Sequence, residues 1–570
     1  MNYINQLFLR LALLPIGIYK RLGVDTVQLK TIVSTKLLMD DRRPNTFHQT
    51  QHNRKQTPIT MSTVGTMLLC ALFGLIYLMA FTFGNNIITQ FTLYYSFFFF
   101  MLASTLITDF TSVLIDVRDN FIILPKPVSD RTFITARLLH IFVHICKLVV
   151  PMALPGIVYI GLNYYVTGVL YYVLMLLMLT LFTIFFINAL YLLILKVTTP
   201  EKFKSIISYI QIFFAIAVYA SYQVVPRLIG RYVGSDINLS GKGYSLAIPS
   251  FWFASGWKVL QSFRATPIEA VGTVLSIAVP LLSLYIVIKY LAPSFNQKLA
   301  LLNSSDAEVP RKINTNKKSK QDNSFATLAS KVVTQKGAER MGFIFTWKMT
   351  SRSRDFKLKV YPTIGYILVY VVLIFLNKKS INLQDIQSQN ISGKILVISA
   401  LYFSSLLLVM AISQITISEK YKAAWIYYAC PIPKPGEVIS GAIKAAVLKF
   451  YIPIVVVLTL AGIILIGPKL LPNIVLGLFN ELLIASIIAY VHNRQLPFSQ
   501  QQNNNSGSGN FIRSIFIMFC CGLIGLIHYA VYELTAVVII LSVLSMIATW
   551  LVIGGIKNTS WQALAVATNE

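Results

Sequence analysis

Acidic residues inside apolar stretches are the first candidates for chemistry in this chain. Asp109 lies about two turns inside one apolar run, and Glu481, with Asn480 beside it, lies midway along another. Ionisable groups at such depth in a membrane are costly and commonly functional. Asp109, Glu481 and Asn480 are therefore candidates for a translocation pathway. For Asp109 a paired or water-facing carboxylate is an equal alternative, because Asp116 falls on the same helical face.

Two histidines could do metal chemistry. His140 and His144 are spaced i, i+4 on an expected helix, which would let both imidazoles reach one ion. No Asp or Glu stands near them in the sequence, and no H-E-x-x-H motif is formed. We therefore expect hydrogen bonds to a neighbouring helix, and no metal site. No Ser-His-Asp set or paired carboxylates indicate an enzyme.

The elements that position these residues follow from composition. The chain has 570 residues, of which 56% are hydrophobic and 12% charged, against about a quarter charged in soluble domains. Apolar runs of about 20 residues are typical of membrane-spanning helices, and their continuity excludes a barrel. We predict an all-α polytopic membrane protein with about twelve spans. The runs are 62–83, 91–115, 133–162, 166–195, 205–226, 268–292, 361–376, 395–417, 446–466, 471–491, 513–532 and 535–556.

The formal net charge of +28 is distributed as a topology signal. Lys and Arg gather before the first run and in the central loop, so the positive-inside rule places both, and both termini, in the cytoplasm. Nucleic acid is not an expected partner. Membrane lipids are, because Leu7, Leu11, Leu14 and Ile18 share one face of an expected interfacial helix near the N-terminus.

An internal repeat is suggested by similar segments in both halves. The arms "STKLLMDDRRPN" and "TWKMTSRSRDFK" precede the first run of each half, and a Pro-Lys-Pro corner follows the second. The predicted division is 1–60 N-terminal arm, 61–292 first six-helix half, 293–360 basic linker and second arm, 361–556 second six-helix half, and 557–570 tail.

Each corner is an amphipathic piece with a proline stop. In "ILPKPVSDRTFITARLL" Ser129 can cap the next helix, and "CPIPKPGEVISGAIKA" follows aromatic residues that include Trp425 and Tyr428. A loop that re-enters a bilayer commonly contains proline and basic anchors. Duplication at matching places favours a shared function instead.

The layout resembles that of bacterial type-two ATP-binding-cassette exporter permeases. In that family an interfacial elbow helix opens each six-helix half, and a coupling helix ending in a proline corner lies between helices two and three. An external membrane-embedded segment lies between helices five and six, where this chain has "IPSFWFASGW". Its aromatic residues, Phe251 to Phe253 and Trp257, also suit an interfacial belt. One departure is the short connection around Glu533, which leaves no room for such a segment in the second half.

The resemblance implies the membrane-spanning subunit of an ATP-driven exporter in the bacterial cytoplasmic membrane. No G-x-x-x-x-G-K-[ST] loop is present, so ATP and Mg²⁺ would be bound by a separate ATPase subunit, in two copies. No cofactor and no catalysis are expected in this chain. The residues expected to contact the ATPase are Arg118, Asp119, Phe121, Leu124, Pro125, Lys126, Pro127, Trp425, Tyr428, Pro433, Lys434, Pro435 and Glu437.

The alternative is a proton-coupled secondary transporter of the twelve-helix facilitator type, which shares the six-plus-six layout. That family has a glycine-containing G-x-x-x-D-[RK]-x-G-R-R motif where this chain has "DVRDNFIILPKP". A polytopic membrane enzyme is a third and more distant alternative. The sequence does not indicate which substance is transported.

Overall fold

The protein is all-helical across the residues that its computed structural model describes, which are 3–42, 61–82, 86–113, 126–198, 200–232, 239–286, 289, 325–376, 391–418, 420–492, 494–501 and 507–564. No strand occurs in these ranges, and Ile417 and Gln500 form an isolated bridge. Nine helices in these ranges are long and apolar enough to cross a membrane. The predicted class, an all-α polytopic membrane protein, is confirmed.

The predicted apolar runs correspond to helices. One apolar stretch, Asp130–Ile194, covers the third and fourth runs, and its backbone leaves helical geometry at Tyr164 and Tyr165. The fifth and eleventh runs are the shorter apolar helices Ser205–Ser221 and Phe519–Val531. The seventh begins earlier than expected, because α14 (Arg354–Leu376) continues through Pro362. The total of twelve spans stays a prediction.

The chain divides into two compact units. Unit 1 comprises Met1–Ile207 and Leu228–Arg311, and unit 2 comprises Ser208–Arg227 and Lys312–Glu570. The boundary passes through one helix, α8 (Pro200–Tyr232), whose middle belongs to unit 2. There Arg354 Nε donates to Ser208 Oγ at 2.9 Å. The domain limits and the repeat that the sequence suggests stay predictions.

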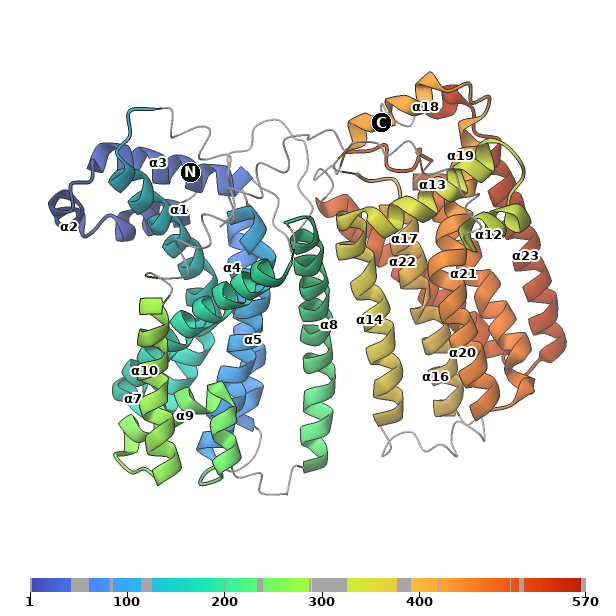
Figure 1. Cartoon of the computed structure of the whole chain (residues 1–570). Helices are drawn as coiled ribbons and strands as arrows, with labels where there is room; N and C mark the ends of the chain where they lie inside the picture. The colour runs from blue at the N-terminus through green and yellow to red at the C-terminus, as the bar shows by residue number, and fades with distance from the viewer. Residues whose placement is uncertain are drawn as a thin grey trace. The chain divides into compact units, whose positions relative to one another are not determined.

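Unit 1 contains an arm of short helices followed by membrane helices. The arm comprises α1 (Tyr3–Ala12), α2 (Ile16–Arg21) and α3 (Thr26–Arg42), and it packs against the first turns of α7 (Asp130–Val197). The membrane helices are α4 (Met61–Tyr77), α5 (Ile87–Val113), α7 and α10 (Pro267–Ile286). Figure 1 shows the arm at one end of this bundle. We call that the arm end of unit 1, and the opposite end its far end.

At the far end of unit 1 a short helix is inserted among the long ones. The 3-10 turn η2 (Gly243–Ala247) leads into α9 (Pro249–Ser262), which lies in the position expected for the external segment. Trp257 is buried, stacks on Phe91 with ring centroids 3.8 Å apart, and donates to the Gly168 carbonyl at 3.0 Å. The interfacial-belt interpretation is wrong for Phe251, Phe253 and Trp257, because α9 packs its aromatic face against protein instead of lipid.

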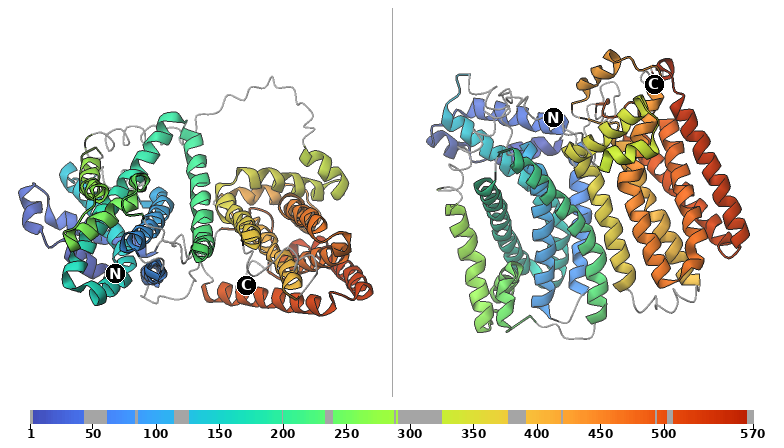
Figure 2. Two further views of the ribbon diagram at one scale, coloured as in Figure 1. Left: turned by 90° about the horizontal axis from the view of Figure 1, so that it is seen from below. Right: turned by 45° about the vertical axis from the view of Figure 1, so that its right-hand side comes forward.

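Unit 2 also combines short helices at one end with a bundle. Its membrane helices include α14, α16 (Ile391–Phe403), α17 (Ser405–Gln414), α20 (Ile452–Leu465), α21 (Leu471–His492), α22 (Gly507–Val531) and α23 (Thr535–Lys557). The short helices at its arm end are α12 (Phe325–Val333), α13 (Ala338–Arg352) and α18 (Trp425–Ala429). In the view from below, several helices of each unit are seen end-on, so they run nearly parallel within it (Figure 2).

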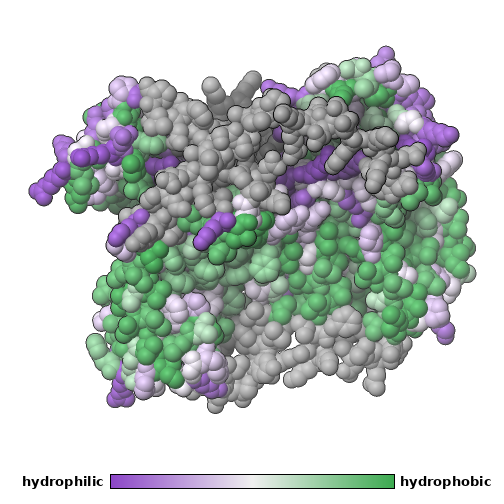
Figure 3. Space-filling model, in the orientation of Figure 1, coloured by the Kyte–Doolittle hydropathy of each residue, from purple (hydrophilic) through white to green (hydrophobic). Residues whose placement is uncertain are grey.

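The second corner opens a long helical stretch. α19 (Pro435–Ala446) passes through a π-helical turn, η5 (Val447–Tyr451), into α20. By contrast, only three residues separate α22 from α23, as the short connection around Glu533 predicts. Hydrophobic residues cover the helix bodies of each unit, and hydrophilic ones gather toward their ends (Figure 3).

Candidate functional site

The second Pro-Lys-Pro corner presents an apolar surface at the arm end of unit 2. Trp425, Ile426 and Tyr428 of α18 are 66%, 52% and 65% exposed, and Pro433 is exposed beside them. We call these four residues the corner surface. Exposed aromatic side chains of this size are the kind that carry binding energy in protein interfaces.

The corner surface has a rigid foundation. Tyr427, between the exposed residues, is buried, and its hydroxyl donates to the Pro497 carbonyl at 3.0 Å. From the residues after α23, Trp561 Nε1 donates to the Ile432 carbonyl at 2.8 Å, and the Trp561 ring lies 5.2 Å from that of Tyr428. The contacts of Tyr427 and Trp561 therefore hold α18 in place, while the side chains of Trp425, Ile426 and Tyr428 stay exposed.

Other residues expected at the second corner lie in different places. Lys434 is exposed and precedes α19, where its Nζ lies 3.4 Å from Asn558 Oδ1. Pro435 occupies the first turn of α19 and is buried, so it lies behind the corner surface. Proline suits this position because an N–H group in the first turn of a helix has no acceptor within the helix, so its absence costs no hydrogen bond. Glu437 is half-buried in the same turn.

The first corner is described only from Lys126 onward. Lys126 and Pro127 are exposed, and Ser129 caps α7 by accepting from the Thr132 amide at 3.3 Å, as predicted. The remaining residues expected to contact an ATPase in the first half lie outside the described residues; these are Arg118, Asp119, Phe121, Leu124 and Pro125.

In unit 2 the arm helix α13 is joined to the helix after the corner by a buried ion pair. The side chain of Glu339 is 1% exposed, and its Oε1 lies 2.6 Å from Lys444 Nζ on α19. Lys557 Nζ approaches the other carboxylate oxygen at 3.7 Å, and the Gln335 amide donates to it at 3.0 Å. Burial alone would raise the pKa of Glu339, but the hydrogen bond and charge of Lys444, the Gln335 amide and the charge of Lys557 together hold that pKa below its ordinary value.

Glycines bring α13 and α19 close together. A Cβ atom at Gly441 would overlap the Glu339 carbonyl oxygen, and one at Gly342 would overlap the Val438 carbonyl oxygen. Further along, Lys449 Nζ donates to the Trp347 carbonyl at 2.8 Å and to the Thr350 hydroxyl at 2.7 Å, at the end of α13. α13 therefore packs closely along both α19 and η5. We call this contact the joint of unit 2.

Unit 1 has a corresponding joint between its arm and α7. The Asp25 amide donates to Thr132 Oγ1 at 3.1 Å near the start of α3, and Asp40 Oδ2 lies 2.6 Å from His140 Nε2 near its end. Burial alone would raise the pKa of Asp40, but the hydrogen bond and charge of His140, together with the nearby His144 and Lys147, hold that pKa below its ordinary value. In both units an arm helix runs in the same direction as the helix after the corner and pairs an acid with a base on it.

The expected role of His140 in binding a neighbouring helix is confirmed by its contact with Asp40. Asp40 is a hundred residues away in the chain, so local spacing does not reveal this acid as the partner of His140. Among the described residues no group of three or more His, Cys, Asp or Glu side chains could hold a metal ion.

A polar cluster inside the membrane bundle of unit 2 includes two of the three pathway candidates. Asn480 Nδ2 donates to Tyr402 Oη at 2.9 Å, and Ser545 Oγ donates to Asn480 Oδ1 at 2.6 Å. Glu481, the next residue of α21, is 1% exposed and lies 2.8 Å from Ser404 Oγ. The third candidate, Asp109, belongs to the last turns of α5, and its side chain lies outside the described residues.

From Tyr402 the hydrogen bonds continue through His528. Its Nδ1 lies 3.2 Å from Tyr402 Oη, and its Nε2 lies 3.1 Å from Asn473 Oδ1. Asn473 Nδ2 in turn donates to the Tyr532 carbonyl at 3.4 Å. Because the amide oxygen of Asn473 can only accept, His528 donates from Nε2. If Tyr402 donates to His528 Nδ1, every donor from Ser545 to Asn473 points the same way, toward the far end of unit 2.

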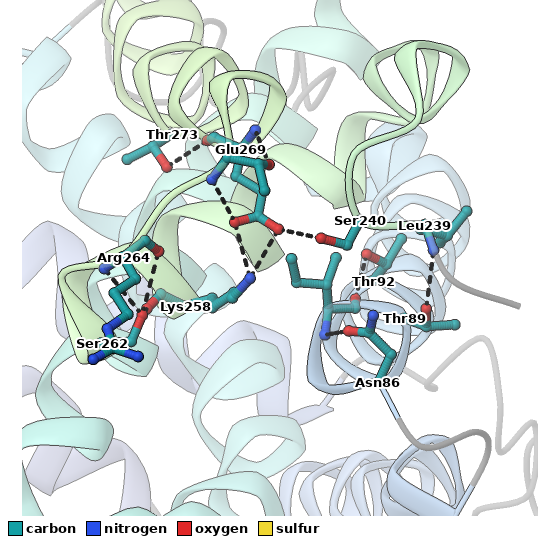
Figure 4. A network of polar contacts seen from close by, with 12 residues as sticks. Asn86, Thr89, Thr92, Leu239, Ser240, Lys258, Ser262, Arg264, Glu269 and Thr273 are labelled. Carbon is teal, nitrogen blue, oxygen red and sulfur yellow. Dashed lines mark hydrogen bonds and ion pairs between the residues drawn. The ribbon is translucent and has the colours of Figure 1, made fainter. Parts of the chain in front are cut away.

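The far end of unit 1 carries another buried acid, on α10 (Figure 4). Glu269 is fully buried and receives Lys258 Nζ at 2.8 and 2.9 Å, with Ser240 Oγ donating at 2.5 Å. These bonds tie α9 and the segment before it to α10. Glu269 is fully satisfied by these partners and serves to hold the inserted helix in place.

Comparisons with known proteins add no relative: no family model, curated protein or solved structure matches this chain. The resemblance to exporter permeases therefore stays an expectation that rests on the layout and on the two corners.

Proposed function

We propose that this chain is the membrane-spanning permease of an ATP-driven exporter, and that the corner surface is a docking site for a separate ATPase subunit. The observation that carries the proposal is the exposure of Trp425, Ile426 and Tyr428 on an otherwise anchored helix. An apolar surface held rigidly at the end of a membrane bundle loses little conformational entropy when a partner covers it.

The joint between α13 and α19 supports a mechanical role for the corner. α19 is buried along most of its length and continues through η5 into α20, so a force on the corner is passed into the membrane bundle. The arm helix α13 would have to move with it, because the Glu339–Lys444 pair and the glycine contacts leave no gap between them. Similar contacts between α3 and α7 in unit 1 support two such inputs, one for each of two ATPase copies.

The arm ends face the cytoplasm in this proposal, in agreement with the positive-inside rule. In unit 1 the outward side chains of α1 and α2 support contact with lipid headgroups, since Leu7, Leu11 and Ile18 are all more than half exposed. The membrane would be the cytoplasmic membrane of a bacterium, with both termini inside.

Site-specific photo-crosslinking tests the docking site. A photoreactive residue at Tyr428, in the full chain expressed in cells, should capture a protein that contains a G-x-x-x-x-G-K-[ST] loop. The matched control is Trp550, which is 73% exposed, against 65% for Tyr428, but lies on the membrane helix α23. Capture of lipid alone at both positions, or of the same proteins at both, would contradict the proposal.

Substitution tests the coupling. Trp425→Ala and Tyr428→Ala should leave membrane insertion intact and weaken ATPase binding by at least about 2 kcal/mol each, roughly thirtyfold in affinity. Transport that persists without ATP and stops when a proton gradient is dissipated would favour the secondary-transporter alternative instead.

A further inference from the structure

The carboxyl group of Glu481 lies in a setting that suits a neutral acid. It is 1% exposed on α21, inside the membrane bundle, and the hydroxyl group of Ser404 is its hydrogen-bonding side chain, 2.8 Å from Oε2. No ion pair to Glu481 is present in the described part of unit 2. A buried charge without a cationic partner costs several kcal/mol, in rough terms, whereas a protonated carboxyl does not carry that cost.

The single hydrogen atom of the Ser404 hydroxyl is compatible with a protonated Glu481. Ser404 Oγ lies 2.8 Å from Glu481 Oε2 and also 2.8 Å from the Leu401 carbonyl oxygen. A serine hydroxyl has one hydrogen and can donate to only one of these oxygens. If it donates to Leu401, as serines in helices commonly do, the contact with Glu481 requires a hydrogen on the carboxyl group.

The site can nevertheless hold both forms without moving its heavy atoms. With the proton bound, Glu481 donates to Ser404, which donates to Leu401. With the proton released, the Ser404 hydrogen turns toward the carboxylate. Rotation of this one hydroxyl therefore replaces one hydrogen-bond pattern with the other.

Residues next to Glu481 belong to elements that lead toward both ends of unit 2. Tyr451 belongs to η5, the π-helical turn whose Lys449 holds the end of α13, and such turns are frequent at functional sites. Asn480, adjacent in sequence, begins the polar chain through Tyr402 and His528 toward the far end. The titratable groups that face Glu481 are Tyr402 of α16, Tyr451 of η5 and Cys521 of α22, with His528 one hydrogen bond beyond Tyr402.

We propose that Glu481 is a proton-binding site, and that the Ser404 hydroxyl accepts a hydrogen bond from the protonated carboxyl group and donates one to the carboxylate. The site goes beyond the proposed function, because it does not depend on which energy source drives the protein. Its ligand is the proton itself, taken up by a carboxylate and released from a carboxylic acid with no other reactant.

Infrared spectroscopy of the purified full chain in lipid nanodiscs tests this site. At neutral pH the wild type should show the carbonyl stretching band of a protonated carboxylic acid, with a shift in D₂O. Glu481→Gln should abolish that band, while Glu533→Gln, which removes an exposed acid paired with Lys394, should leave it unchanged. A band that is absent, or that survives in Glu481→Gln, overturns the proposal.

A second variant tests the site even if Glu481→Gln fails to fold. Ser404→Ala retains the carboxyl group and removes one hydrogen-bond partner, so the same band should persist at a higher frequency. An unshifted band would show that the observed acid is a different residue and would also overturn the proposal. Since no ATPase is present in these measurements, their failure would leave the docking site unaffected.

Discussion

The buried ion pair between α13 and α19 allows the sharpest quantitative prediction. Glu339→Gln removes the negative charge that faces Lys444 at 2.6 Å and Lys557 at 3.7 Å. Removing one partner of a buried pair typically costs about 3–5 kcal/mol, because the other charge stays buried. Both lysine side chains are more than a quarter exposed and can regain some water. We therefore expect the lower end, about 3 kcal/mol of unfolding free energy.

Chemical denaturation of the purified chain in detergent, followed by tryptophan fluorescence, measures this loss. Trp347 on α13 and Trp561 near the corner are reporters close to the joint. The control is Glu437→Gln, which changes a half-buried acid in the first turn of α19. If Glu339→Gln is no less stable than this control, the ion pair does not hold α13 to α19. A force on the corner would then not be passed to α13 through this pair.

A double-mutant comparison separates the pair from its surroundings. Lys444→Met removes the cation but keeps much of the side-chain volume, so adding Glu339→Gln to it should cost clearly less than Glu339→Gln alone. Equal costs in both backgrounds would mean that the carboxylate acts through the Gln335 amide or Lys557, and not through Lys444.

The ion pair also predicts a pH dependence. The pKa of Glu339 is held below its ordinary value in the folded protein, so the folded state binds this proton more weakly than the unfolded chain does. The stabilisation is therefore complete above the unfolded pKa of about 4.3 and is lost as the pH falls through the lower folded value. Glu339→Gln should remove this acid-range component from the stability profile.

Further predictions concern packing and the joint in unit 1. Gly441→Ala should destabilise the fold by about 1–3 kcal/mol, because the new Cβ would overlap the Glu339 carbonyl oxygen. Gly554→Ala, the control, has open space around it and should be neutral or slightly stabilising. Equal unfolding midpoints for the two variants would refute the close packing of α13 and α19. Asp40→Asn should cost about 1.5–3 kcal/mol by weakening the contact with His140, and its effect should vanish as the pH falls well below about 3.9, the unfolded pKa. A stability profile for Asp40→Asn that matches the wild type at neutral pH would argue against this contact.

The helical class and the approximate membrane runs were predictable because they depend on local composition. A run of about 20 apolar residues is stable in a bilayer only as a helix, whatever its neighbours are. Trp425 and Tyr428 were predicted to contact an ATPase, and both side chains are exposed in the structure. The burial of Tyr427 between them was not predicted, because its partner, the Pro497 carbonyl, is 70 residues away.

The contacts within and beneath the candidate site depended on residues far apart in the sequence. Asp40 and His140, Glu339 and Lys444, and Trp561 and Ile432 are each separated by about a hundred residues or more. The expected interfacial belt failed for a related reason. Aromatic residues beside a membrane suit both lipid and protein neighbours, and only the insertion of α9 among longer helices decides between them.

The sequence by itself determined that this is a helical membrane protein, that its basic segments precede membrane bundles, and that two proline corners interrupt it. Hydrophobicity and proline geometry act over a few residues, so they can be identified without a structure. Only the tertiary structure decided which charges are paired and which aromatic residues stay exposed. It also placed the carboxyl group of Glu481 beside Ser404 and Tyr451. Ion pairing and protonation depend on distances of a few ångströms between groups that the chain brings together only when it folds.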